Sequence, residues 1–578
     1  PLESFDRSSL HTMEVLTFQF GHFSNFVGTH FWNIEDEVSW SEQKQEDDED
    51  TTEGFDEPIL DFNRLHFEVE EGRHKTWQPR AIIVDKKGAL GAATTTERMS
   101  AEEVAHSVLW DQRVEQFGES PVEAHEFQKD LEQDDDEHQI QWGGDSTHHD
   151  EDEDYEVVPM ETQPGPQEVA DTAMKTSRDY KFSGTVRTWT DFLKIKLPAK
   201  SVHELQSCHH DVQPFNVFFD GFEVKRNDDE DSIIDIARRQ MERCDQLDAY
   251  HSLIDSHDGM GGVASVVLQW AQEEQPKAGH LAMGFRPPST PSSSSSAPPP
   301  MENGEAPGVA SADPEIFSWL SSAFSLHHCL DIGVDCWIPC PVPIWSAQRP
   351  RPLRPLDPTC PYEVAALPAL SMHVATAPYR LLGSMRPSAF LSALTPSSRP
   401  VSGLLLALPM AADQKALAGI QPDFFDISGM SRGLLNPYSS LSLYGAQPDL
   451  LVSLSSSLPL PARKLSFTRM KNLPLPLPFP QFFDPIVSRK GRWEKEASQA
   501  LKRGADEEVE CVPAATLIHA AAGGSGKIES VSLMRKTLLH VKRHGIASTL
   551  CAKYAVEADD FNQVLEVISD VLESGAAS

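Results

Sequence analysis

Residues 18–32 read FQFGHFSNFVGTHFW, and this stretch carries the clearest structural signal in the 578-residue chain. It continues the alternating strand pattern that starts after Met13, turns at Gly21 and runs on into a segment rich in aromatic residues. A strand that turns through glycine into a helix exposes backbone N–H groups, and such turns hold phosphate in nucleotide-binding α/β proteins. The stretch therefore predicts an α/β domain with nucleotide-binding topology.

Two later stretches extend this pattern in the order that an α/β domain requires. Pro79 to Asp85, PRAIIVD, contains a short apolar run typical of a strand covered on both faces, and it ends in a carboxylate. Residues 244–254 combine the end of a helix with a strand, and residues 258–264, DGMGGVA, form a glycine-rich turn behind it. This alternation favours a sheet covered by helices.

The three stretches, taken in this order, resemble signature regions of tubulin. Residues 18–32 are similar to its first strand, phosphate-facing turn and first helix, and residues 79–85 to a strand that ends near the nucleotide's metal. Residues 244–264 are similar to its helix, strand and glycine-rich loop. Within the tubulin and FtsZ superfamily, Val186 to Phe192, VRTWTDF, together with a long acidic insert, is similar to the Misato family. The resemblance covers residues 13–290.

The resemblance implies an α/β fold with a tubulin/FtsZ-like N-terminal nucleotide-binding-type domain, an α+β second domain and C-terminal helices. It also implies a regulator of mitochondrial distribution, morphology and fusion, found in the cytoplasm and peripherally on the mitochondrial outer membrane. Two alternatives stay open. One is an active tubulin/FtsZ-like GTPase that assembles head to tail. The other is a cytosolic scaffold that acts with tubulin or a chaperonin. The oligomeric state is open as well.

Seven residues form the nucleotide site that the resemblance implies, with GTP or GDP as its possible ligand: Gly21, His22, Asn25, Asp85, Gly259, Gly261 and Gly262. Tubulin and FtsZ place glycines and a small hydroxyl residue in the third loop, where this chain has Asp258 and Met260. A carboxylate at that point repels a triphosphate unless a cation intervenes. We therefore expect a degenerate site in which the glycines make the tight turn from strand to helix.

Hydrolysis in this superfamily needs an acidic residue from a loop that we place between Tyr379 and Met410. No Asp or Glu occurs from Val364 to Ala412, and His373 is the titratable acceptor left in that interval. Activation of water requires a proton acceptor within reach, so we expect weak or absent GTPase activity and no catalytic residue.

Charge and composition limit the partners further. The formal net charge of −39 disfavours nucleic acid, and no window of about 18 apolar residues predicts a membrane span. The eight cysteines show no disulfide framework. The His327, His328, Cys329, Cys336 and Cys340 cluster lacks a standard zinc spacing, so no metal site is predicted.

The predicted domain boundaries follow from composition. Residues 1–12 are a leader or disordered, and residues 13–286 form the tubulin-like domain, with acidic disordered inserts at 42–57 and 128–170. A Pro/Ser-rich linker at 287–312, the second domain at 313–488 and a C-terminal helical region at 489–578 complete the chain.

Overall fold

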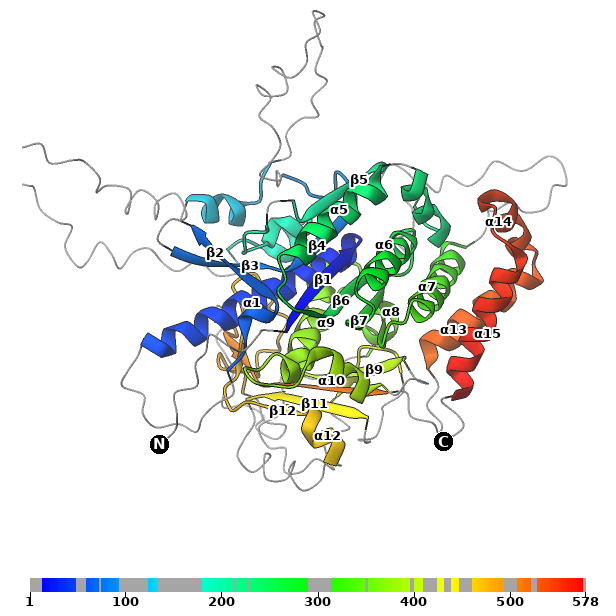
Figure 1. Ribbon diagram of the computed structural model, residues 1–578. Helices are drawn as coiled ribbons and strands as arrows, with labels where there is room; N and C mark the ends of the chain where they lie inside the picture. The colour runs from blue at the N-terminus through cyan, green and yellow to red at the C-terminus, as the bar shows by residue number, and fades with distance from the viewer. Residues whose placement is uncertain are drawn as a thin grey trace, which may run out of the picture.

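A computed structural model describes most of the chain (Figure 1). The described residues are 13–47, 59–71, 74–92, 123–133, 179–198, 200–210, 215–226, 228–288, 313–348, 352–395, 400–408, 424–430, 438–445, 460–492, 507–520 and 528–574. The predicted leader, residues 48–57 and 134–170 of the two predicted inserts, and residues 289–312 of the predicted linker lie outside them. The prediction of disorder is wrong for residues 42–47 and 128–133, which are helical.

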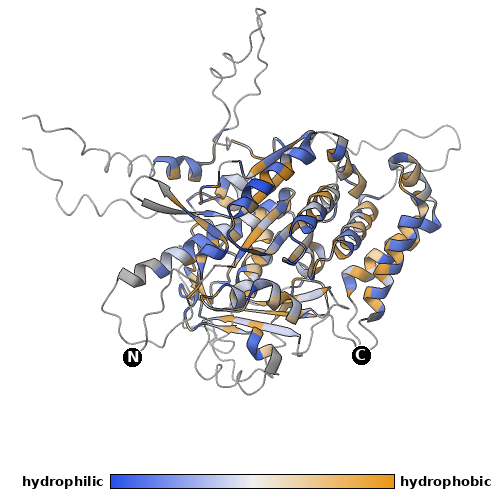
Figure 2. Ribbon diagram, viewed as in Figure 1, coloured by the Kyte–Doolittle hydropathy of each residue, from blue (hydrophilic) through white to orange (hydrophobic). Residues whose placement is uncertain are grey.

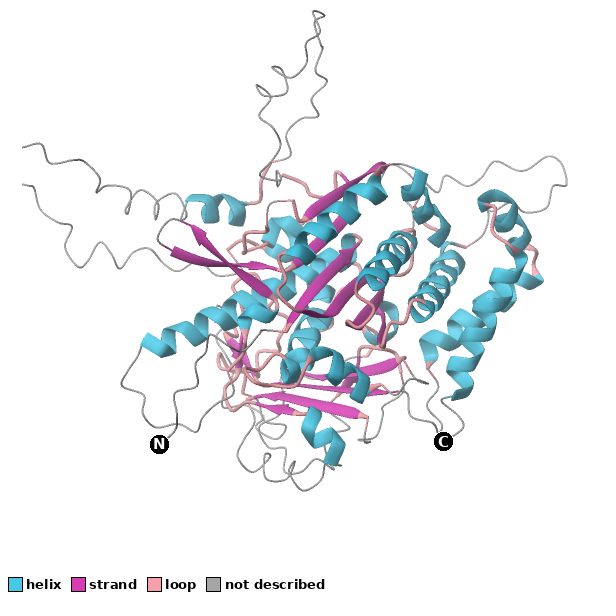
Figure 3. Cartoon of the chain, in the orientation of Figure 1, coloured by secondary structure: helices cyan, strands magenta, loops and turns pink. Residues whose placement is uncertain are grey.

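A parallel six-stranded sheet is built from strands between residues 14 and 341, so it extends beyond the predicted end of the tubulin-like domain at residue 286 (Figures 1 and 3). Its order is β5-β4-β1-β6-β7-β8, so the first strand lies in the interior between β4 and β6. The strands are β1 (Glu14–Phe20), β4 (Ala81–Lys87), β5 (Val202–His209), β6 (Leu247–Asp255), β7 (Gly279–Arg286) and β8 (Cys336–Pro341). All neighbouring pairs are parallel, which confirms the predicted α/β class.

Helices cover both faces of this sheet, because its strands carry apolar side chains in both directions. Val15 and Ile83 join one buried cluster, while Leu16 and Ile82 join the other. The first cluster includes helices α1 (His22–Asp47) and α9 (Pro361–Thr376). The second includes α5 (Asp229–Glu242), α6 (Met260–Glu274) and α7 (Pro314–Asp331).

A second, five-stranded sheet lies on the far side of α9, which packs on both α1 and this sheet. Its order is β10-β9-β15-β11-β12. The strands are β9 (Ser402–Ala407), β10 (Phe425–Asp426), β11 (Ser439–Tyr444), β12 (Phe467–Thr468) and β15 (Ala514–Ala520). The predicted C-terminal helical region, 489–578, is wrong at β15, because the apolar run AATLIHA is buried along its whole length as the middle strand.

Three helices end the described chain on the side of the molecule opposite β2 and β3, and the first and third of them pack on α7 (Figure 1). They are α13 (Glu529–Arg543), α14 (Ile546–Tyr554) and α15 (Ala558–Ser574). In the last helix Phe561, Val564 and Ile568 are buried, and hydrophilic residues line the outer side of these helices (Figure 2). Among the described residues, the structure contains no helix with the length and apolar character that a membrane crossing needs.

Short elements connect these layers. They are η2 (Phe62–Arg64), β2 (His66–Glu71), β3 (His74–Pro79), α4 (Phe182–Thr185), η3 (Trp189–Phe192), η4 (Phe218–Arg226), α8 (Val342–Trp345), η6 (Ala377–Tyr379), α10 (Pro387–Leu394), α12 (Leu460–Leu465), β13 (Leu473–Pro474) and β14 (Cys511–Val512).

A buried polar cluster joins α1 to the second sheet. Oε1 of Glu35 accepts a hydrogen bond from Nδ1 of His373 at 2.7 Å and pairs with the Arg380 guanidinium. Burial opposes ionisation of Glu35, yet Arg380 and His373 outweigh it and lower its pKa to about 2. The His373 ring reaches the Tyr444 hydroxyl of β11 at 3.2 Å. These groups neutralise one another where the two layers meet.

Candidate nucleotide site

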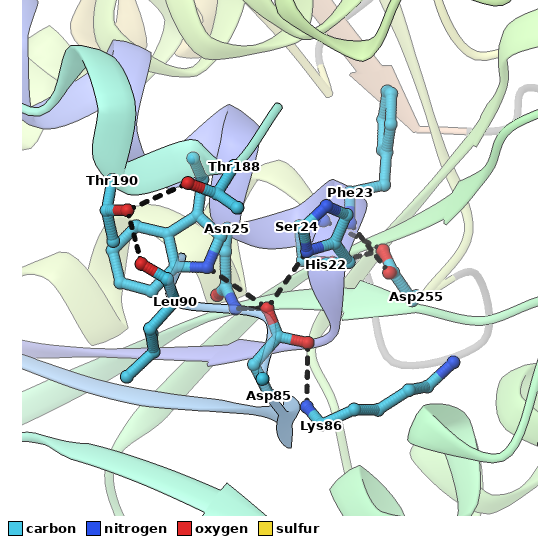
Figure 4. A network of polar contacts seen from close by, with 12 residues as sticks. His22, Phe23, Ser24, Asn25, Asp85, Lys86, Leu90, Thr188, Thr190 and Asp255 are labelled. Carbon is cyan, nitrogen blue, oxygen red and sulfur yellow. Dashed lines mark hydrogen bonds and ion pairs between the residues drawn. The ribbon is translucent and has the colours of Figure 1, made fainter. Parts of the chain in front are cut away.

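The candidate site lies at the carboxyl edge of the central sheet, where β4, β1 and β6 end side by side. In parallel α/β sheets, ligands bind at this edge. Asp85 and Lys86 lie near the end of β4, β1 leads into Gly21, and β6 ends with Asp255. Figure 4 shows Asp85 and Asp255 on either side of the start of α1.

Asp85 is the centre of a dense set of hydrogen bonds (Figure 4). Its Oδ2 accepts from Nδ2 of Asn25 at 2.9 Å and from Nε1 of Trp189 at 3.0 Å, and it lies 3.3 Å from Nδ1 of His22. Its Oδ1 accepts from the backbone N–H of Lys86 at 2.8 Å. Both carboxylate oxygens therefore have donors from the chain itself.

These contacts set the ionisation of the pair formed by Asp85 and His22. Burial opposes the charge of Asp85, but the hydrogen bonds from His22 and Asn25 outweigh burial and lower its pKa. Burial also opposes protonation of His22 and acts to lower its pKa. The neighbouring Asp85 acts more strongly in the other direction, so the pKa of His22 is raised. The pair therefore favours an imidazolium beside a carboxylate.

A second carboxylate, Asp255, caps the N-terminus of α1 (Figure 4). Its oxygens accept from the backbone N–H groups of Phe23 and Ser24 at 2.9 and 2.8 Å, and from the Ser24 hydroxyl at 2.7 Å. These N–H groups are two of the donors that a helix leaves unpaired at its start. An anion is favoured there by the helix dipole, and here it comes from β6.

The close approach of Asp255 explains the glycine at the turn. Gly21 has φ +106, and a Cβ atom at this position would lie 2.4 Å from Oδ2 of Asp255. Burial and the nearby Asp258 raise the pKa of Asp255 to about 7. The carboxyl group thus titrates near neutral pH while it holds the start of α1.

The backbone N–H groups at the N-terminus of α6 also find hydrogen-bond acceptors within the chain. Each backbone N–H group of residues 259–262 donates to an acceptor within the chain. The acceptors, in order, are the Phe215 carbonyl at 3.1 Å, Oδ1 of Asp258 at 2.9 Å, the Asp258 carbonyl at 3.3 Å and the Gly259 carbonyl at 2.9 Å. These are the groups that the glycine-rich turn would offer to a phosphate.

The charge of Asp258 is balanced by a lysine that the sequence pattern did not single out. Nζ of Lys86 lies 3.3 Å from Oδ2 of Asp258 and 5.3 Å from the centre of the Phe215 ring. Burial opposes the charge of Lys86, but Asp258 and Asp85 raise its pKa. Lys87, the next residue of β4, is exposed instead.

The segment η4 packs directly on the first turn of α6. A Cβ atom on Gly262 would lie 2.1 Å from the Phe218 carbonyl oxygen, and one on Gly221 would lie 2.0 Å from the Gly259 carbonyl oxygen. Backbone therefore meets backbone here, and glycine on both sides permits the contact.

Neighbouring helices hold η4 in this position. The Phe218 N–H donates to the Ser321 hydroxyl of α7 at 2.9 Å. The Tyr554 hydroxyl of α14 donates to Oδ1 of Asp220 at 2.6 Å, and the Phe219 ring packs against Tyr554 and Phe561. The C-terminal helices are thus linked through η4 to the glycine-rich turn.

The region expected to supply a catalytic carboxylate, between Tyr379 and Met410, begins after α9 and includes α10 and β9. Its Arg386 pairs with Asp248 at the amino end of β6, and Leu382 is 52% exposed. His373, the acceptor noted from the sequence, is fully buried in the pair with Glu35. The described part of this region, residues 379–395 and 400–408, contains no Asp or Glu.

The structure brings several of the predicted site residues together and adds others. Gly21, His22, Asn25 and Asp85 form one group, while Gly259, Gly261 and Gly262 begin α6 on the other side of β1. The sequence patterns did not identify Lys86 or Asp255 as site residues, and they did not predict that η4 packs over the first turn of α6. A carboxylate at the end of a central strand is the signal that could have identified Asp255.

Comparison with known proteins agrees with the resemblance. Residues 13–133 match the family model described as the Misato Segment II tubulin-like domain. The chain is 25% identical to Protein misato homolog 1 of Danio rerio over 428 residues, 72% of this chain and 66% of that protein. It is 24% identical to Protein misato homolog 1 of Homo sapiens over 446 residues, 75% of this chain and 70% of that protein. Protein misato of Drosophila melanogaster is 25% identical over 287 residues, 46% of this chain and 44% of that protein.

Proposed function

We propose that this chain, a tubulin-like relative of the Misato proteins, regulates mitochondrial distribution, morphology and fusion without hydrolysing GTP. In this proposal its nucleotide site is closed by the chain's own groups. The protein works in the cytoplasm and on the mitochondrial outer membrane, where it binds peripherally.

The observation that carries the proposal is the pairing of the backbone N–H groups of residues 259–262. Phosphate binding at the start of a helix depends on unblocked N–H groups that point at the anion. A nucleotide would have to displace Asp258 and the Phe215 carbonyl, and each lost hydrogen bond costs about 1 kcal/mol net. It would also have to separate η4 from Gly262, where backbone atoms are already in contact.

Electrostatic repulsion also opposes the binding of a nucleotide in this site. Two unit charges about 4 Å apart near a protein surface interact with roughly 4 kcal/mol. A phosphate in this site would face the Asp258 carboxylate and, above about pH 7, the Asp255 carboxylate as well, while the amine of Lys86 is already paired. The balance favours the chain's internal contacts over a triphosphate.

In this proposal, GTP hydrolysis is opposed by a second feature, the lack of a proton acceptor. Water attack on a phosphate needs a positioned proton acceptor, and the loop between α9 and α10 contains no carboxylate. His373 is buried with Glu35 and cannot reach a neighbouring molecule from that position. We therefore assign a regulatory or scaffolding role, with tubulin and a chaperonin as partners to test by affinity pull-down.

Nucleotide content and hydrolysis test the closed site directly. Denatured, purified protein should release well below one equivalent of guanine nucleotide, as measured by mass spectrometry. The chain should also hydrolyse GTP no faster than its Gly262→Asp variant, which places a third carboxylate at α6. Gly184→Asp is the matched control, because a Cβ atom at Gly184 meets nothing within 4 Å.

Stoichiometric nucleotide in the wild-type chain would overturn the proposal. So would GTP hydrolysis that rises per molecule with protein concentration and is lost in Gly262→Asp but retained in Gly184→Asp. Those results would favour the assembling GTPase.

The mitochondrial role is tested in cells that lack the chain. The wild-type protein should restore mitochondrial distribution and network shape, as measured by microscopy, and a share of it should be released from isolated mitochondria by high salt or alkaline carbonate. Normal mitochondria in cells without the chain, or protein that resists extraction, would contradict the proposed role or its peripheral location.

A further inference from the structure

The outward face of α13 carries an unusual arrangement of charge. Leu539 is 45% exposed at its centre. Arg535 and Lys536 precede Leu539 by four and three residues, and Lys542 and Arg543 follow it by three and four residues. Residues three and four apart are neighbours on a helix, so all four neighbours of this leucine on its face are cations.

These cations stand out in a protein with 88 acidic and 49 basic residues. Among the described residues, none of the four forms an ion pair with a carboxylate, although all four are exposed. Arg535 instead contacts the Ser569 hydroxyl and Lys542 contacts the Asn562 amide oxygen, both from α15.

Several exposed cations elsewhere in the described chain pair with a carboxylate, although others, such as Lys277, do not. Lys129 pairs with Glu123 at 2.7 Å, and Arg238 pairs with Asp235 at 2.7 Å. Positive charge at the last turn of a helix complements the helix dipole, which accounts for Lys542 and Arg543 but not for the earlier pair. The earlier cations and the exposed leucine need a different explanation.

We propose that this face of α13 docks an acidic amphipathic helix of a partner protein. The partner would present one apolar side chain to Leu539 and carboxylates to the cations on either side. The two pairs of cations lie seven residues apart, which is about 10 Å along the helix axis. Such a spacing matches carboxylates on one face of a facing helix, as in the charged flanks of a helical pair.

The shape of the surface favours a narrow partner over an anionic membrane. The α15 residues that contact α13, Asn562 and Ser569, lie on the same side of α15 as Glu566. A broad anionic surface laid across both helices would meet that carboxylate, whereas a single helix can follow α13 alone. The buried face of α13, with Val531 and Leu538, is held by α7 and keeps its position.

The test uses the full chain and a labelled helical peptide of fifteen residues. The peptide carries glutamates three and four residues on each side of one leucine, and fluorescence anisotropy measures its binding. Wild-type protein should bind it saturably, with an affinity that falls as salt rises. Lys536→Glu should weaken binding at least about fivefold, because an attraction becomes a repulsion. Leu539→Ser should weaken it about threefold and keep the salt dependence.

Lys277→Glu is the matched control, since this exposed lysine before β7 undergoes the same change of charge. It should change binding less than about twofold, and all variants should melt like the wild type because the positions are exposed. Absence of saturable binding up to about 1 mM peptide would overturn the proposal. Equal losses in Lys536→Glu and Lys277→Glu would also overturn it. Phosphatidylserine vesicles that bind through Lys536, without any binding of the peptide, would assign the surface to lipid.

Discussion

Replacing Asp255 by asparagine removes the charge and the titration of the carboxylate that caps α1, while it keeps the size of the side chain. An amide oxygen can still accept from the Ser24 N–H, although the Phe23 N–H then faces an amide NH₂ group. The change therefore separates the effect of ionisation from most of the packing at this site.

The pKa of Asp255 sets the size and the direction of the expected change in the free energy of unfolding with pH. The folded chain holds this proton up to a pH of about 7, whereas an unfolded aspartate releases it near pH 4. The stabilisation from the bound proton is fully present below about pH 4, falls by about 1.4 kcal/mol per pH unit as the pH rises, and is lost above about pH 7. The complete change is about 4 kcal/mol over roughly three pH units.

Urea unfolding followed by tryptophan fluorescence at several pH values between 5 and 8 measures this effect. The free energy of unfolding of the wild type, minus that of Asp255→Asn, should fall by about 3 kcal/mol across this range. Taking the difference cancels the titration of other buried groups. For the control Asp235→Asn, an exposed residue beside Arg238, the difference should stay constant. A constant difference for Asp255→Asn as well would refute a neutral pKa at the start of α1.

Two further predictions concern packing and buried charge. Gly262→Ala should lower the free energy of unfolding by about 2 kcal/mol, because its Cβ atom would lie 2.1 Å from the Phe218 carbonyl oxygen. Gly184→Ala, where a Cβ atom meets nothing within 4 Å, should be neutral or slightly stabilising in the same urea measurement. Glu35→Ala should cost about 3–5 kcal/mol, because the Arg380 guanidinium is left buried without its counter-ion. Calorimetric melting measures this loss, and an unchanged melting temperature would show that the cluster does not hold the layers together.

The sequence predicted the parts of the site that depend on local order along the chain. The strand and turn at residues 14–21, the strand that ends at Asp85 and the turn before α6 each have their own pattern of apolar residues and glycine. The resemblance to tubulin implied one site containing Asn25, His22 and Asp85, and the parallel strands bring these residues together.

Other parts of the site depend on contacts between distant segments, which no local pattern reports. Lys86 and Asp258 are 172 residues apart, and Asp255 reaches Ser24 across 231 residues. The segment η4 has many phenylalanines but no helical period, so its place over α6 follows only from the assembled layers. The strand β15 was missed because an apolar run of seven residues fits a helix or a strand equally well.

Two helix N-termini meet at this edge, and each presents partial positive charge that favours an anion. In the function proposed above, Asp255 and Asp258 supply that anion from within the chain, and Lys86 balances the second of them. A tethered carboxylate loses no translational freedom on binding, so its effective concentration far exceeds that of a free nucleotide at about 1 mM. The glycines of residues 259–262 can therefore keep the geometry of a phosphate-binding turn while the chain itself occupies its donors.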